Sequence, residues 1–279
     1  MSKKSEILDI LKWMGIVVAG GGLGAGGMLL AFDAQKNHFA DMGNGLPLLV
    51  EGVHLKEGNH NVVMTDQFCK LLSYEDTTQE DRDLAINGLK EAYTTLNEYN
   101  SKLNFNFCTT NKDFAEQYNI PKVNSIGKRD IPLYLTTDIL ENNKYVMAKT
   151  NWDYNSFTYE MKDLSITIKK DCLFQVWKVY ETLEETLTPK NSAAYTIAIH
   201  ETMHAMGFAH VDPKVAESIM NAYVSYRSPK DLTEFDKQIL DKYNVQFYGA
   251  TPTFVTSEET TTSSSNLVMP KIEEEGLVA

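Results

Sequence analysis

Cysteine is scarce in this chain. Of its 279 residues only three are cysteines, Cys69, Cys108 and Cys172, and no two of them form a C-x-x-C pair. This spacing excludes a cysteine-based zinc ribbon and a thioredoxin-type redox site, and so few cysteines exclude a disulfide scaffold. Two possibilities remain open for the cysteines, namely one internal disulfide bridge, or thiols that are all buried or unpaired.

Positive charge is also scarce. The chain has 26 Lys and Arg against 38 Asp and Glu, a formal net charge of -12, and no run of Lys or Arg is longer than a pair. Nucleic-acid binding needs basic patches that neutralise phosphates, so we expect no nucleic-acid partner. The hydrophobic content of 43% is typical of a globular protein with one large domain or two small ones.

One long uncharged stretch lies near the N-terminus. Trp13–Phe32 has no charged residue and follows Lys3, Lys4 and Lys12. Twenty apolar residues at about 1.5 Å rise each cross a hydrocarbon core about 30 Å thick. We expect residues 1–32 to form a single-pass membrane anchor with the N-terminus inside and the rest of the chain outside, because flanking lysines stay cytoplasmic. The alternative is a signal segment whose cleavage leaves a secreted protein.

The rest of the chain divides by composition into three parts. Residues 33–59 carry Gly, Asn and Pro and are expected to be a connector. Residues 60–248 have the composition of a compact domain. Residues 249–279 are rich in Ser, Thr and Glu with almost no aromatic side chains, which is typical of a disordered tail.

The first half of the compact domain is expected to hold one long helix and several strands. Apolar residues at helical spacing predict a helix over Thr78–Tyr99, opened by a capping box of Thr78 and Asp81. In KLNFNFC (102–108) apolar residues alternate with asparagine, which predicts a half-buried strand. Residues 173–187 are compatible with strand or helix. Further short strands are expected at Ile131–Thr136, Tyr145–Ala148, Phe157–Met161 and Leu164–Ile168.

Two helices are expected in the second half. One begins near Thr188–Pro189, because proline is favoured at the first helical position, and continues through SAAYTIAIHETMHAM. It is apolar on all sides apart from hydroxyls and one motif, so it should be buried. The last helix spans about Thr233–Tyr243, with Thr233 and Asp236 as its capping box.

The sequence HETMHAMGFAH holds three of the six histidines of the chain. His200 and His204 lie one helical turn apart on one face, so both rings can reach a metal ion about 2 Å from each nitrogen. Gly207 permits the left-handed conformation that ends a helix, which can return His210 as a third ligand. Glu201 lies about 100° around the helix, close enough to contact a water on the metal. Three ligands with an open fourth position are typical of catalytic zinc.

Other interpretations of this motif remain open. An H-E-x-x-H pattern arises by chance in ordinary helices, although the additional Gly207 and His210 make chance much less frequent. A structural zinc site would use a fourth protein ligand, which the motif does not supply. A metal-free role would leave two histidines and a glutamate in an apolar helix without partners, at a large cost in free energy.

The pattern H-E-x-x-H-x-x-G-x-x-H at 200–210 resembles the extended zinc signature of the metzincin metalloproteases, which is followed by a Met-turn. Ser218–Met220 resembles that turn, and LTEFDKQILDKYN (232–244) is similar to the closing helix of the matrixin branch. The resemblance covers roughly residues 60–245 and is most specific at 200–220.

The resemblance implies a metzincin-like zincin catalytic domain. Its fold would be α/β (α+β), with a small twisted sheet, an active-site helix, a Met-turn and a C-terminal helix. One catalytic Zn2+ ion would be held by His200, His204 and His210, with Glu201 as the catalytic base.

The resemblance also implies structural roles for Gly207, which turns the chain, and for Met220, which would lie beneath the ligands without binding the metal. The sequence departs from the relatives at three points. The surroundings of Cys69 do not match the cysteine switch of matrix metalloproteases. Ala222 stands where the astacin branch has a tyrosine ligand, and no calcium-loop pattern is present.

These features predict a zinc-dependent endopeptidase that hydrolyses extracellular or cell-surface proteins through a metal-activated water. Glu201 would take the proton and pass it to the leaving amine. The peptide or protein substrate is expected to extend along an edge strand, for which Leu164–Ile168 is the candidate. The alternative is a catalytically inactive zinc-bearing surface protein that binds or scaffolds a partner. The presence of Glu201 favours the enzyme.

Overall fold

The structure is a computed structural model that describes residues 45–138, 140, 146–174, 188–222 and 229–253. Within these residues no helix is both long and apolar enough to cross a membrane. The longest, α4 (Gln79–Tyr99), carries charged residues along its length. The expectation of a single-pass membrane protein is corrected by this finding, and the segment Trp13–Phe32 on which it was based lies outside the described residues.

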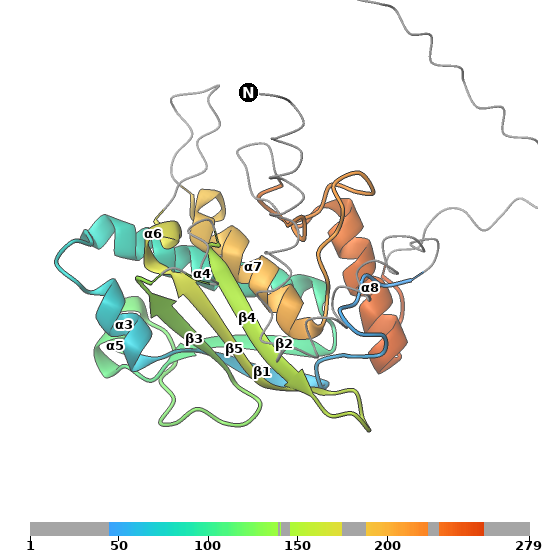
Figure 1. Cartoon of the computed structure of the whole chain (residues 1–279). Coiled ribbons are helices and arrows are strands. Elements are labelled where there is room, and N and C mark those ends of the chain that lie inside the picture. Colours follow the sequence, from blue (N-terminus) through green and yellow to red (C-terminus); the bar gives the residue numbers. More distant parts are fainter. Residues whose placement is uncertain (1–44, 139, 141–145, 175–187, 223–228, 254–279) are drawn as a thin grey trace, which may run out of the picture.

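Five strands form one mixed sheet in the order β2-β1-β3-β5-β4 (Figure 1). The strands β2, β1, β3 and β5 run parallel to one another, and β4 pairs antiparallel with β5 at one edge. The expected α/β class is confirmed at this level. The bounds are β1 (Gly58–Met64), β2 (Leu103–Thr109), β3 (Ile131–Thr136), β4 (Ala148–Tyr154) and β5 (Met161–Lys169).

Two long helices lie together across one face of the sheet (Figure 1). α7 (Ala193–Met206) packs against β4 and β5, and α4 packs against α7 and β2. α8 (Glu234–Tyr248) meets the C-terminal end of α7, where the Tyr243 hydroxyl donates to Met206 O at 2.8 Å. The shorter elements are α3 (Asp66–Leu72), α5 (Lys112–Tyr118), α6 (Lys170–Leu173) and the 3-10 turn η2 (Pro189–Asn191).

Side-chain caps define where the helices begin. The Thr78 side chain accepts from Asp81 N at the start of α4, and Thr233 with Asp236 forms the complete capping box of α8, as predicted. The expected start of α7 was wrong. Thr188 and Pro189 begin the short turn η2, and α7 starts after Ser192, whose hydroxyl accepts from Tyr195 N. Ser192, which follows Pro189, therefore caps α7, whereas Thr188 makes no side-chain cap hydrogen bond.

The strand predictions were mixed. β2 and β3 lie where their alternating residues placed them. Residues 157–161 were expected to be a strand, but the chain turns there, because the Asn155 side chain accepts from Phe157 N and Thr158 N. The strand expected at 145–148 instead begins at Ala148, and Tyr145 lies outside the described residues.

The candidate edge strand was also wrong. Leu164–Ile168 belongs to β5, which is paired on both sides, with β3 and with β4. The edge next to α7 is β4. Local alternation cannot distinguish these strands, since it reports one buried face and not the number of neighbours.

The described part of the expected connector packs onto the domain. We call residues 46–55 the N-terminal strap. It buries four leucines and a valine, and it crosses the end of α7 at Gly207. Leu48 forms an antiparallel bridge with Phe208, and Leu49 N–H donates to Gly207 O at 2.8 Å. The strap therefore contributes to the core beside the histidine motif.

Candidate metal centre

The helix α7 carries the motif through the interior of the protein. Every residue of α7 is buried except His200 and His204, which are partly exposed. The helix ends at Gly207, which has a φ of 104°. This left-handed conformation favours glycine and turns the chain, as the sequence predicted.

The three histidines of the motif converge on one point. Nε2 of His200 lies 3.1 Å from Nε2 of His204 and 3.2 Å from Nε2 of His210, and the last pair is 3.1 Å apart. Among the described residues, this is the group of His, Cys, Asp and Glu whose ligand atoms are close enough to hold a metal ion together. The turn at Gly207 thus brings His210 back to the helix.

Hydrogen bonds define the tautomers of two of these rings. Nδ1 of His200 donates to Ile219 O and Nδ1 of His204 donates to Phe208 O, both at 2.8 Å. A carbonyl oxygen only accepts, so the proton of each neutral ring is on Nδ1 and Nε2 carries a lone pair. Two lone pairs that face each other at 3.1 Å repel, and a cation between them would remove this repulsion.

Burial keeps the rings of His204 and His210 neutral. Burial and the neighbouring His200 lower the pKa of His204 to about 3. Burial and both other imidazoles lower the pKa of His210 well below its ordinary value. Neutral imidazole is the form that binds a metal.

The nitrogen positions fit a tetrahedral metal site. Zinc binds imidazole nitrogen at about 2.0–2.1 Å, so two tetrahedral nitrogen ligands lie about 3.3 Å apart. The observed separations are 3.1 to 3.2 Å. His210 Nδ1 is buried and has no hydrogen-bond partner among the described residues, so its ring is oriented by packing.

Glu201 lies next to His200 on α7 and is 6% exposed. Thr150 of β4 contacts it twice, because Thr150 Oγ1 lies 2.6 Å from Glu201 Oε2 and 2.8 Å from Glu201 O. Burial raises the pKa of the Glu201 carboxyl, and nearby His200 and the Thr150 hydrogen bond partly oppose that shift. A carboxylate whose affinity for protons is increased can accept one more readily during a reaction.

The segment that resembles a Met-turn supports His200 through its main chain. Ile219 O accepts from the His200 ring, and Ile219 N–H donates to Asp236 Oδ2 at 2.9 Å. Asp236 is completely buried and also accepts from the Ser218 hydroxyl and from Thr233. The start of α8 therefore positions the His200 ring, whereas the sequence indicated this segment only as a capping box.

The N-terminal strap supports the other two histidines. Ala209 N–H donates to Pro47 O at 2.7 Å. Ala209 lies between Phe208, whose carbonyl accepts from the His204 ring, and His210. Met220 is fully buried, and its carbonyl accepts from Val211 N at 2.9 Å. The strap and the segment around Met220 thus contact the loop that carries His210 from two sides.

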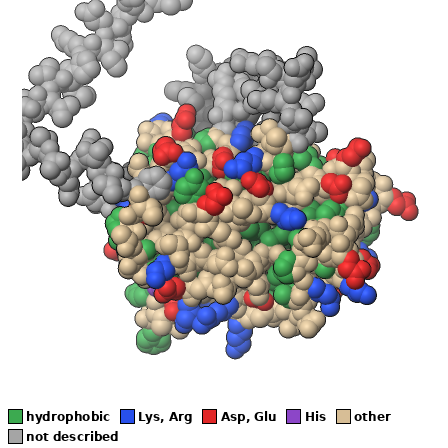
Figure 2. Space-filling view, turned by 180° about the vertical axis from the view of Figure 1, so that it is seen from behind, with side chains coloured by type: hydrophobic (Ala, Val, Ile, Leu, Met, Phe, Trp, Pro, Cys, Tyr) green, Lys and Arg blue, Asp and Glu red, His purple; other side chains and the backbone are tan. Residues whose placement is uncertain are grey.

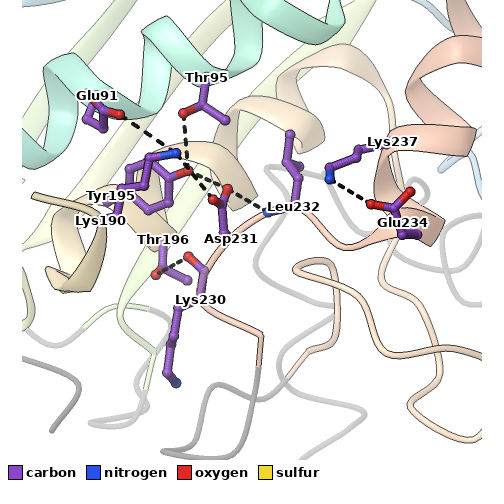
Figure 3. A network of polar contacts seen from close by, with 10 residues as sticks. All are labelled: Glu91, Thr95, Lys190, Tyr195, Thr196, Lys230, Asp231, Leu232, Glu234 and Lys237. Carbon is purple, nitrogen blue, oxygen red and sulfur yellow. Dashed lines mark hydrogen bonds and ion pairs between the residues drawn. The ribbon is translucent and has the colours of Figure 1, made fainter. Parts of the chain in front are cut away.

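A polar network holds the first turns of α7 (Figure 3). The Tyr195 hydroxyl contacts Thr95 of α4 and Asp231, which lies shortly before α8. Lys190 Nζ lies 3.4 Å from Asp231 Oδ2 and 3.7 Å from Glu91 Oε1. These contacts connect α4, η2, α7 and the segment that leads into α8, so the elements around the histidines are held as one unit.

Other residues singled out in the sequence lie away from this cluster. The three cysteines are free thiols and all are buried. Cys69 Sγ contacts Thr109 Oγ1 on β2 and is not part of the metal-binding group. Thr150 was missed, and no local pattern could have identified it, because its contact with Glu201 spans 51 residues.

Comparisons with models of protein families and with curated protein sequences found no match to this chain.

Proposed function

We propose that this protein is a zinc-dependent endopeptidase with a metzincin-like catalytic domain. The observation that carries the proposal is the convergence of three imidazole nitrogens beside a buried carboxylate, Glu201, which lies on the same helix as two of the histidines. His200, His204 and His210 would hold the metal. The motif spacing, the left-handed Gly207 and the turn at Met220 support this assignment.

A zinc ion held by His200, His204 and His210 would supply a Lewis acid for the scissile carbonyl and for the attacking water. Glu201 acts as general base and takes a proton from the attacking water. The new C–O bond forms, the peptide C–N bond breaks, and Glu201 returns the proton to the leaving amine nitrogen. The Thr150 hydroxyl is hydrogen-bonded to Oε2 of Glu201, whereas Oε1 makes no hydrogen bond to a described residue. We therefore assign the proton transfer to Oε1.

An extended peptide fits the outer edge of β4. Lys169 N–H donates to Met147 O, and Ala148 lies opposite Ile168. In an antiparallel ladder this makes Ala148 and Ile168 a non-hydrogen-bonded pair, whose main-chain groups point away from the partner strand. Thr150, two residues later, also belongs to a non-hydrogen-bonded pair. Their N–H and C=O groups can therefore pair with a substrate strand, by addition of a strand to the sheet edge.

Substitution of Glu201 and of one ligand tests the proposal on the full chain. Glu201→Gln keeps shape and hydrogen bonding but cannot take the proton. We expect zinc content to stay near one per chain, while cleavage of a peptide library slows by about 10²–10⁴. His204→Ala should lose zinc and cleavage together, because two nitrogens hold zinc poorly. Zinc content is measured by elemental analysis and cleavage by mass spectrometry.

The wild-type protein gives the deciding result. If it binds zinc stoichiometrically but cleaves no peptide in the library, the peptidase assignment is wrong, and the inactive zinc-bearing protein becomes the better description. If Glu201→Gln cleaved at the wild-type rate, the role of Glu201 as base would be wrong.

A further inference from the structure

Thr150 joins two parts of the proposed reaction site. Its side chain is 4% exposed and faces α7, and its hydroxyl contacts both the carboxylate and the main-chain carbonyl of Glu201. Its main-chain groups lie on the outer side of β4, at the open sheet edge. One residue thus contacts the base through its side chain and faces the substrate edge through its backbone.

A threonine hydroxyl has one proton and two lone pairs. When Glu201 is ionised, Thr150 donates its proton to Glu201 Oε2, at 2.6 Å. When Glu201 carries the transferred proton on Oε1, Thr150 can keep its donation to Oε2 or turn its proton to Glu201 O, 2.8 Å away. The hydroxyl therefore has a partner in both states. Valine, which has the same shape, offers neither hydrogen bond.

The register of β4 keeps the Thr150 hydroxyl at this position. Thr150 lies opposite Ile166 of β5, and the pairing shifts only after Asn151, where a bulge begins. The bulge lies beyond Thr150, so the residue remains in the regular ladder. The ladder with β5 thus fixes β4 on both sides of Thr150, while the Thr150 side chain contacts α7.

We propose that Thr150 is a positioning residue that holds the Glu201 carboxylate in the orientation needed for proton transfer. This inference rests on the proposed function, since it concerns the same base. A side chain anchored at one oxygen keeps the other directed at its target, whereas an unanchored carboxylate samples several rotamers. Loss of the anchor should therefore lower turnover more than substrate binding.

The experiment compares three variants of the zinc-loaded full chain. Thr150→Val removes the hydroxyl and keeps the shape. Thr150→Ser keeps the hydroxyl. Thr109→Val is the matched control, because Thr109 is fully buried on β2 and its hydroxyl donates to Met64 O at 3.0 Å, away from the histidines.

We expect Thr150→Val to lower kcat by about tenfold to a hundredfold, as for loss of one hydrogen bond to a charged group. KM should change less than about twofold, because the main chain of β4 is unaltered. Thr150→Ser should restore most of the turnover. Thr109→Val should lower the melting temperature without lowering kcat. If Thr150→Val also lost only thermal stability and kept kcat, its role would be structural and the inference would be wrong.

Crystal structures of zinc-loaded wild type and Thr150→Val supply a readout that does not depend on activity. We expect the Glu201 carboxylate to leave its position in Thr150→Val while the three histidines stay in place. An unchanged carboxylate would overturn the positioning role. If the wild-type protein cleaves no peptide, the proposed function fails, and these structures alone decide whether Thr150 positions Glu201.

Discussion

Gly207 combines two constraints at a single residue. Its φ of 104° is rarely adopted by residues with a side chain, and a Cβ built on it would lie 3.0 Å from Val53 O of the strap. The same residue ends α7 and begins the turn that returns His210 to the metal-binding group. Conformation and close packing therefore both favour glycine here.

Gly207→Ala is expected to lower the free energy of unfolding by more than about 1–2 kcal/mol, the cost of a left-handed backbone, because contact with Val53 O adds to it. It should also weaken zinc binding, since His210 moves with the turn. Gly58→Ala is the control, because Gly58 has a φ of 120° but no atom within 4 Å of its Cβ position. Urea unfolding and zinc titration measure both effects. Equal losses in the two variants, with zinc affinity unchanged in both, would contradict this prediction.

At the scale of elements, the crossing of α4 and α7 depends on one small residue. A Cβ at Gly88 of α4 would lie 2.1 Å from the Ser192 hydroxyl and 3.2 Å from Tyr195 N. Ser192 caps α7, so the two helices meet at the cap of the helix that carries the histidines. Glycine within α4 lowers helix propensity but allows this approach.

Gly88→Ala should therefore destabilise the protein, although alanine is the better helix former. We expect a loss of about 1–3 kcal/mol, as is typical for overpacking, because α7 or its cap must move. The neighbouring Asn87 is exposed, and Asn87→Ala should be neutral or slightly stabilising. Thermal unfolding of both variants provides the comparison. A Gly88→Ala protein as stable as wild type would show that the helices can separate at no cost.

At the scale of the whole molecule, one core joins the sheet, both long helices, α8 and the N-terminal strap. Acidic and basic side chains are interspersed on the face of the molecule that Figure 2 shows. The three thiols are buried, and burial raises the pKa of Cys69 and of Cys108 to about 11. In the folded protein these thiols therefore stay protonated at neutral and mildly alkaline pH.

This burial predicts a loss of stability in alkali. The folded pKa of each thiol is raised above its unfolded value, so the stability it contributes is complete below about pH 8.5 and is lost as pH rises toward 11. We expect a fall of about 1 kcal/mol per thiol between pH 9 and pH 10, measured by urea unfolding. Iodoacetamide at pH 8 should leave the folded chain unmodified and label all three cysteines after unfolding.

The double variant Cys69→Ala with Cys108→Ala separates the thiols from other alkaline effects. It should be less stable than wild type at pH 8, because buried sulfur atoms are lost, but its stability should depend less steeply on pH. An equally steep decline in the double variant would assign the alkaline loss to other groups.

Local sequence determined the parts of this protein that depend on neighbouring residues. Thr233 with Asp236 opened α8, the alternation around Phe105 gave β2, and the spacing of His200, His204 and Gly207 predicted a shared face followed by a left-handed turn. These features follow from helix and strand periods and from the conformations of single residues. The grouping of the three histidines was therefore predictable before the fold was known.

Only the tertiary structure decided which strand is the open edge, how the strap crosses Gly207 and what holds Glu201. A strand period is the same in an interior and an edge strand, so β5 was mistaken for the edge that belongs to β4. Thr150 lies 51 residues before Glu201, and their contact exists because β4 lies against α7. Contacts of this kind depend on the order of strands in the sheet, which is set by the packing of the whole core and not by any local pattern.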